Sequence, residues 1–327
     1  MEFEKNVSLK DYTTYKIGGP AKYFFIAKTR EELVGALKEV QKQNLPVFIL
    51  GGGSNLLISE NGFDGLAIKV DIWGVEFKNN KALVGAGESA NRLALLLAPK
   101  GLSGLEWASG MPGTVGGAIY GSAQAFGAKI SDVVESVEAL NKKTLKIKKL
   151  SKRQCQFSLK NSLFKKNKDW VIVSAVLKFK KQNSQETENK VKEFIEYRKT
   201  HHPMDFPSAG STFVNPEIHP VKYRGAVISP RAKLFDRVKI KELYKKYPEL
   251  ENHVKKGVIP VGYMVEKCGL SGKKIGNAQI SEKHANFIIN LGAAKAEDVL
   301  ALINLVKSEV KKTFGISIET EVQLVGF

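Results

Sequence analysis

The feature that most constrains the fold is a capped helical segment followed at once by a short apolar run. Residues 29–43 begin with Thr29 and Glu32, a capping-box pair, and carry apolar side chains at helical spacing. The run VFIL at 47–50 comes next, and a triple glycine separates it from a second run at 56–58. Short apolar runs reached after a helix are typical of buried parallel strands. The sequence therefore predicts a mixed α/β fold.

A change in composition divides the chain into two domains, and further helices and strands are expected in both. A polar stretch, KKQNSQETENK, marks a change in composition at 180–190 and places a domain boundary near residue 200. We expect a domain over 1–200, with sub-domains of about 1–70 and 71–200, and a second domain over 201–327. Expected helices span 91–98, 188–200 and 296–313, and expected strands span 66–70, 82–84, 133–140, 145–150, 170–179 and 316–327.

The charge balance is strongly basic. Lys and Arg total 51 against 33 Asp and Glu, which gives a net charge of +18. Such a chain suits polyanionic partners: nucleic acid, an anionic membrane surface or phosphorylated small molecules. Only seven of the 51 basic residues are Arg, whose planar fork dominates sequence readout, so we expect no nucleic-acid partner. A diffuse Lys excess also fits an ordinary solvated surface.

Cysteine content and hydropathy indicate a cytoplasmic protein. The two cysteines, Cys155 and Cys268, build no disulfide framework, which fits a reducing compartment. The N-terminus lacks the apolar region of a signal peptide. The longest uncharged stretch, 107–128, contains six glycines and Pro112 and is typical of a loop region, so we expect no membrane insertion.

Two glycine loops are the first candidate site. Glycines at 51–53, directly after an expected strand, allow close backbone approach and can aim amide groups at a phosphate. Leu56 stands where a dinucleotide-binding fingerprint needs glycine, so a tight turn remains the alternative. The second loop, 110–118, is either a buried packing loop or the other half of a pyrophosphate clamp.

A third candidate is the segment PSAGSTFVNP at 207–216. Ser211 follows a glycine, but the G-x-S-x-G nucleophile elbow is absent, so a turn-forming serine is the alternative. The His201-His202 pair offers half a metal site without an H-E-x-x-H motif. A solvated loop is the simpler interpretation, and we expect no metal.

These motifs, in this order, resemble the UDP-N-acetylenolpyruvoylglucosamine reductase (UDP-N-acetylmuramate dehydrogenase) family. The resemblance covers nearly the whole chain except about 217–258, which is an insertion relative to the family pattern. We expect this insertion to be a surface excursion with one amphipathic helix, KIKELYKKYPELENHVKKG at 239–257. The segments that carry it are YTTYKIGGPA, LGGGSNLLI, GLEWASGMPGTVGGA, PSAGSTFVNP, IGNAQISEKHANFIIN and ETEVQLVG.

The resemblance implies an α/β fold with a two-part FAD-binding module of the vanillyl-alcohol-oxidase type, followed by an α/β substrate-binding domain. It implies non-covalent FAD, NADPH as the hydride donor, and UDP-N-acetylenolpyruvoylglucosamine as the substrate. Hydride would pass from the flavin to C3 of the enolpyruvyl ether and a proton would be added at C2. The product would be UDP-N-acetylmuramate, a peptidoglycan precursor.

The resemblance also implies roles for individual residues. Ser211 matches the family's proton donor, Glu321 its catalytic glutamate, and Lys160 stands where the family has a catalytic arginine. Adding hydride to a conjugated carboxylate builds negative charge that a cation stabilises, and the protonation needs a donor within reach. The implied substrate contacts are Asn215, His284 and Arg198. The implied FAD contacts are Tyr12, Gly51, Gly52, Gly53, Ser54, Asn55, Leu56, Gly113, Thr114, Gly116, Gly117 and Ser122.

Departures from the family pattern keep two alternatives open. Lys160 retains the positive charge but loses the bidentate fork of arginine, and Ser122 replaces an asparagine. The chain is therefore the reductase or a flavoprotein of the same fold with altered or lost activity. The other alternative is a binding module that uses its Lys-rich surface and the 217–258 insertion for nucleic acid or a membrane.

Overall fold

The computed structural model describes residues 1–216, 237–250 and 258–327, in two compact units. Unit 1 contains residues 1–54, 58–202 and 325–327, and unit 2 contains residues 55–57 and 203–324. The division falls at residue 202, against an expected boundary near 200. It also assigns 55–57 to unit 2 and the last three residues to unit 1, which the sequence did not predict.

The first sheet of unit 1 is mostly parallel. Its strand order is β1-β2-β5-β3, and both β2 and β3 run parallel to β5. Helix α1 (Arg30–Gln43) connects β2 to β3 and begins with the predicted capping box at Thr29 and Glu32. The predicted helix and parallel strand are therefore confirmed. The four strands are β1 (Glu4–Ser8), β2 (Pro20–Ala27), β3 (Val47–Leu50) and β5 (Phe63–Val70).

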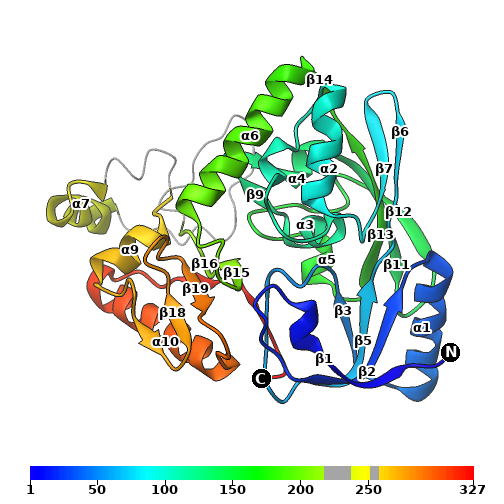
Figure 1. Cartoon of the computed structure of the whole chain (residues 1–327), viewed down its shortest axis with the longest axis horizontal. Coiled ribbons are helices and arrows are strands. Elements are labelled where there is room, and N and C mark those ends of the chain that lie inside the picture. Colours follow the sequence, from blue (N-terminus) through cyan, green and yellow to red (C-terminus); the bar gives the residue numbers. More distant parts are fainter. Residues whose placement is uncertain (217–236, 251–257) are drawn as a thin grey trace. The chain divides into compact units, whose positions relative to one another are not determined.

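The second sheet of unit 1 is antiparallel, in the order β12-β11-β13-β7-β6. Buried side chains of both sheets, including Leu66 and Val137, belong to one continuous core. The strands are β6 (Val75–Lys78), β7 (Lys81–Gly85), β11 (Val134–Asn141), β12 (Ile147–Ser151) and β13 (Trp170–Lys178). The helices packed with them are α2 (Ala90–Leu97), α3 (Val115–Gly121), α4 (Ile130–Val133), α5 (Leu163–Lys166) and α6 (Ser184–His201) (Figure 1).

Unit 2 has a four-stranded antiparallel sheet in the order β15-β19-β18-β17. Helix α10 (Ala296–Phe314) buries one apolar face, as predicted, and ends at Gly315, which has a φ of 67°. The strands are β15 (Ser208–Ser211), β17 (Lys274–Ile275), β18 (Ala278–Ile280) and β19 (Phe287–Asn290), and a second helix is α9 (Val261–Lys267).

The expectation of one terminal strand over 316–327 is wrong. Two short strands replace it: β20 (Glu319–Thr320) pairs with β16 (Phe213–Val214), and β21 (Gln323–Val325) pairs with β4 (Leu56–Ile58). The chain changes partner between these two strands. The N–H of Glu321 donates to the carbonyl of Thr212, and the N–H of Gln323 donates to the carbonyl of Asn55.

Most of the expected insertion at 217–258 lies outside the described residues. Its described part contains α7 (Arg237–Lys246), which ends before Tyr247-Pro248, and most of the remainder of the helix expected over 239–257 lies outside the described residues. Leu250 is 1% exposed, and the Tyr247 ring lies 5.0 Å from that of Phe314. The expectation of a purely surface excursion is therefore wrong at this end of the segment.

Within the described ranges, none of the helices combines the length and hydrophobicity that a membrane span needs.

Candidate functional site

The first glycine loop lies in unit 1 after β3 and is closely packed against the segment around Tyr12. Gly53 has a φ of 62°, and a Cβ on it would lie 1.9 Å from the Tyr12 carbonyl oxygen. The N–H of Thr14 donates to the Gly53 carbonyl at 3.2 Å. Only glycine fits position 53, because any side chain would collide with the main chain.

The two predicted glycine loops meet in unit 1. A Cβ on Gly52 would lie 2.7 Å from the Cα of Gly113, and one on Gly51 would lie 3.0 Å from Thr114 Oγ1. In the reverse direction, a Cβ on Gly113 would lie 2.6 Å from Ser54 Oγ. The structure therefore brings these five predicted cofactor residues together, and the glycines are required where the loops touch.

The meeting loops leave several amide groups available for a ligand. In the part of the chain that the structure describes, no acceptor receives the N–H of Gly52, Gly53 or Ser54, nor that of Gly113 or Thr114. Consecutive amides of this kind form the usual cradle for a phosphate group. The residues present thus fit the pyrophosphate of a dinucleotide cofactor.

The N–H groups of Gly116 and Gly117 form hydrogen bonds within the protein. The N–H of Gly116 donates to the Ala86 carbonyl at 2.9 Å, and that of Gly117 donates to Thr114 Oγ1 at 3.2 Å as part of the α3 N-cap. A Cβ on Gly116 would lie 2.9 Å from that of Ala86. Gly116 therefore permits α3 to pack closely behind the loop, and direct contact of either glycine with FAD stays a prediction.

The other predicted cofactor residues lie at three places. The Tyr12 ring packs on Phe24 at 4.4 Å, and burial together with the carboxylates of Glu4 and Asp11 raises its pKa. Ser122 follows α3 with a φ of 50° and is 2% exposed. Asn55 and Leu56 begin the 55–57 piece of unit 2, where Asn55 Nδ2 donates to the carbonyl of Glu321 at 3.2 Å.

Lys160 lies in a tight turn of unit 1. Ser158 and Asn161 exchange main-chain hydrogen bonds of 2.9 and 3.2 Å, which leaves Lys160 at the turn with a φ of 51°. Ser162, just after the turn, donates from Oγ to the Tyr120 carbonyl of α3 at 2.7 Å. The turn is thus tied to the end of α3, where Ser122 lies.

Arg198 is buried in unit 1 and holds main-chain carbonyls. Its Nε donates to the Ser109 carbonyl at 2.9 Å and its Nη2 to that of Trp107 at 2.8 Å. Burial lowers the pKa of this guanidinium. Arg198 therefore positions the segment that leads into the second glycine loop, and a substrate contact for it stays a prediction.

The two catalytic candidates of unit 2 lie on neighbouring segments. Ser211 ends β15 opposite Phe287, and the N–H of Glu321 donates to the carbonyl of Thr212 at 2.8 Å. The next residues, Phe213 and Thr320, are paired in register. The structure brings Ser211 and Glu321 together, although they are 110 positions apart in sequence.

Asn286 fixes this arrangement and was missed by the sequence reasoning. It is 4% exposed, accepts from the Phe213 N–H through Oδ1 at 3.0 Å, and donates from Nδ2 to the Phe213 carbonyl at 3.0 Å. An asparagine that bonds both main-chain groups of one residue acts as a substitute strand. Its position in the HANFIIN motif was the available signal.

The predicted substrate residues His284 and Asn215 each have an internal partner in unit 2. His284 Nδ1 accepts from the N–H of Asn286 at 3.2 Å, which assigns the proton of the neutral ring to Nε2. Asn215 Oδ1 accepts from the Val261 N–H at 2.9 Å, at the first turn of α9. Their contact with a substrate stays a prediction.

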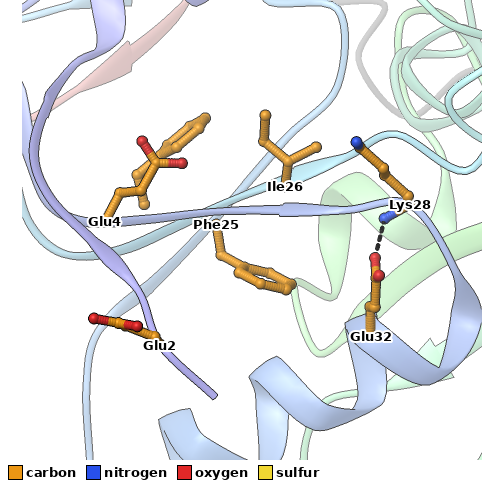
Figure 2. Close-up of a pocket in the computed structure, with 7 residues that line it drawn as sticks. Glu2, Glu4, Phe25, Ile26, Lys28 and Glu32 are labelled. Carbon is orange, nitrogen blue, oxygen red and sulfur yellow. Dashed lines mark hydrogen bonds between the residues drawn. The ribbon is translucent and has the colours of Figure 1, made fainter.

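A pocket of about 320 Å³ in unit 1 is lined in part by Phe24, on which the Tyr12 ring packs. Figure 2 shows its lining, in which Glu2, Glu4 and Glu32 supply three carboxylates and Lys28 donates from its N–H to Glu32. Three carboxylates do not suit a pyrophosphate, and none of the predicted site residues lines this pocket.

Comparisons with known proteins cover both units. Residues 21–149 match the model of an FAD-binding domain, and residues 202–325 match that of the UDP-N-acetylenolpyruvoylglucosamine reductase C-terminal domain. The chain is 35% identical to the reductase of that name from Caldanaerobacter subterraneus, over 98% of this chain and 93% of the relative. It is 34% identical to the one from Bacillus subtilis, with the same shares covered.

The structure agrees with these matches. It resembles the crystal structure of UDP-N-acetylenolpyruvylglucosamine reductase from Thermus caldophilus with a TM-score of 0.75 and 28% identity, over 99% of each chain. The expected α/β fold with an FAD-binding part and a C-terminal part is confirmed. The chain belongs to the UDP-N-acetylenolpyruvoylglucosamine reductase family.

Proposed function

We propose that this chain is the reductase that converts UDP-N-acetylenolpyruvoylglucosamine to UDP-N-acetylmuramate with FAD and NADPH, in peptidoglycan precursor synthesis. Relatives of that name along the whole chain support the activity. The observation in the structure that carries the proposal is the pair of meeting glycine loops, because their free amides suit a dinucleotide pyrophosphate.

Unit 1 binds the cofactor in this proposal. FAD, when bound, supplies the hydride chemistry between NADPH and C3 of the enolpyruvyl group. The amides of Gly52–Ser54 and of Gly113 and Thr114 would hold its pyrophosphate. The binding is non-covalent, because neither loop contains a His or Cys that could form a bond to a flavin.

Unit 2 carries the proton transfer. Ser211 Oγ donates a proton to C2 of the substrate, and Glu321, on the neighbouring segment, stabilises the hydroxyl in its donating geometry. Asn286 keeps the two segments in register. Lys160 of unit 1 supplies the cation for the charge that develops on the substrate carboxylate.

The family resemblance assigns the remaining substrate contacts to His284 and Asn215. His284 is held in place by the Asn286 N–H, which donates to its Nδ1 at 3.2 Å. Asn215 offers Nδ2, because its Oδ1 holds α9. We place the protein in the cytoplasm, which its two free cysteines support.

Purified protein and its substrates test the proposal. We expect a yellow protein whose FAD is released by acid precipitation, and NADPH oxidation that requires UDP-N-acetylenolpyruvoylglucosamine and yields UDP-N-acetylmuramate by mass spectrometry. A yellow protein without substrate-dependent oxidation would favour a flavoprotein with lost activity. A colourless protein would favour a binding module and contradict the proposal.

A further inference from the structure

The positive charge of the chain is concentrated in one segment. Residues 142–168 contain ten Lys, one Arg and no Asp or Glu, so this segment carries 11 of the 18 net charges. The other 300 residues share the remaining seven. A diffuse Lys excess would spread evenly, so this segment needs a separate explanation.

The structure places this segment at the outer edge of a sheet in unit 1. Its only long strand is β12, which ends the order β12-β11-β13-β7-β6 and, among the residues that the structure describes, pairs only with β11 (Figure 1). Five basic side chains on and directly beside β12 are exposed: Lys146, Lys148, Lys149, Lys152 and Arg153. These five are called the basic edge below.

The protein does not neutralise the basic edge. Among the described residues, none of its five cations forms an ion pair with a carboxylate. The hydrogen bond with Lys81 is the main cause that lowers the pKa of Glu135, Lys149 is a minor one, and the Glu135 carboxylate already pairs with Lys81 at 2.7 Å. The charges therefore add to one another and to the field outside the sheet edge.

The arrangement favours a flat anionic surface. Lys148 and Lys149 stand opposite Ala139 and Glu138 of β11, so successive side chains project to the two faces of the sheet. Lysine side chains are long and flexible. The lysines on both faces of the sheet can therefore reach the same flat surface when the edge of the sheet faces it.

We propose that the basic edge docks unit 1 on a membrane surface that contains anionic lipid headgroups. A cluster of this size gives salt-sensitive, peripheral attraction to such a surface. Nucleic acid is disfavoured, because four of the five cations are Lys and no aromatic residue of 142–168 is exposed for base stacking.

Vesicle binding by the full-length flavoprotein tests this docking. The edge variant replaces Lys146, Lys148, Lys149 and Lys152 by Gln. The control variant replaces four other exposed lysines of unit 1, Lys38, Lys180, Lys190 and Lys192, by Gln, and so has the same net charge. Binding is measured by co-sedimentation with vesicles of phosphatidylglycerol and phosphatidylcholine in equal parts, and with phosphatidylcholine alone.

We expect the wild type and the control variant to bind the mixed vesicles in low salt and not to bind vesicles of phosphatidylcholine alone. The edge variant should bind at least about tenfold more weakly, with unchanged NADPH oxidation in vesicle-free solution and an unchanged unfolding temperature. Equal weakening of both variants would overturn the proposal, because net charge alone would then explain binding.

Two other outcomes would also overturn it. Wild type could bind duplex DNA and no vesicles, which would make nucleic acid the partner. Alternatively, wild type could bind neither, while the edge variant self-associates in size-exclusion chromatography. The lysines would then serve only to keep an exposed strand from pairing with another chain.

Discussion

Asn215 illustrates how the structure changes the meaning of a predicted site residue. Its Oδ1 accepts from the Val261 N–H and so holds the first turn of α9, while its Nδ2 is the donor that we assign to the substrate. The two ends of one amide therefore have separate tasks, and substitutions can separate them.

We expect Asn215→Asp to keep the stability of the protein, because it retains the acceptor oxygen, and to raise the KM for the UDP substrate by adding a negative charge. Asn215→Ala should lower the free energy of unfolding by about 1 kcal/mol, the usual net contribution of one hydrogen bond. Urea denaturation and steady-state kinetics measure the two effects. Equal stability of all three proteins would show that the Val261 hydrogen bond contributes nothing.

Lys160 is a second residue whose role can be tested by single substitutions. If its cation stabilises the developing charge on the substrate, Lys160→Ala should slow substrate reduction by about 10²-fold or more, while Lys160→Arg should keep or raise the rate. Lys168→Ala is the matched control, since Lys168 is an exposed lysine a few residues further on. An unimpaired Lys160→Ala enzyme would remove this residue from the site.

At the scale of elements, the contact between the two glycine loops determines whether a cofactor can bind. A Cβ on Gly52 would push against the main chain of Gly113, whereas a Cβ on Gly121, in α3, would meet no atom within 4 Å. The two glycines lie in the same unit, so they form a matched pair.

Gly52→Ala should therefore lower the FAD content per chain strongly, and Gly52→Asp should abolish it by adding a negative charge beside the pyrophosphate. Gly121→Ala should leave it unchanged. Flavin absorbance relative to protein concentration after purification gives the result. Full FAD content in Gly52→Asp would show that the cofactor lies elsewhere.

The segment after α7 offers a second test at this scale. Leu250 is buried at 1% exposure, so Leu250→Ala should lower the free energy of unfolding by about 2–4 kcal/mol. Leu95→Ala, at a position that is 43% exposed, should change it little. Chemical denaturation of both variants shows whether the end of the 217–258 segment belongs to the core. Equal denaturation midpoints for the two variants would show that Leu250 adds no core packing.

Local signals predicted the elements well, and contacts between distant segments were not predictable. The capping pair Thr29–Glu32 located the start of α1. A similar signal at Asn183, which accepts from the Glu186 N–H, was missed, and α6 therefore begins earlier than expected. The internal tasks of Arg198 and Asn286 depend on hydrogen bonds to carbonyls and amides of segments far away in sequence. No periodicity or spacing encodes such partners.

At the scale of the whole molecule, the proposed chemistry divides between the two units. The glycine loops that fit the cofactor lie in unit 1, and Ser211 and Glu321 lie together in unit 2. A change at Ser211 should therefore leave the reaction with NADPH intact and affect only the reaction with the enolpyruvyl substrate.

The central test measures the two half-reactions of Ser211→Ala separately by anaerobic stopped-flow, following flavin absorbance. We expect reduction by NADPH near the wild-type rate and reoxidation by UDP-N-acetylenolpyruvoylglucosamine slower by several orders of magnitude, with Ser211→Cys, which keeps a transferable proton, retaining more. If Ser211 only shapes the turn after Gly210, alanine should slow both half-reactions alike or neither, with a lower unfolding temperature. That result would contradict its assignment as the proton donor.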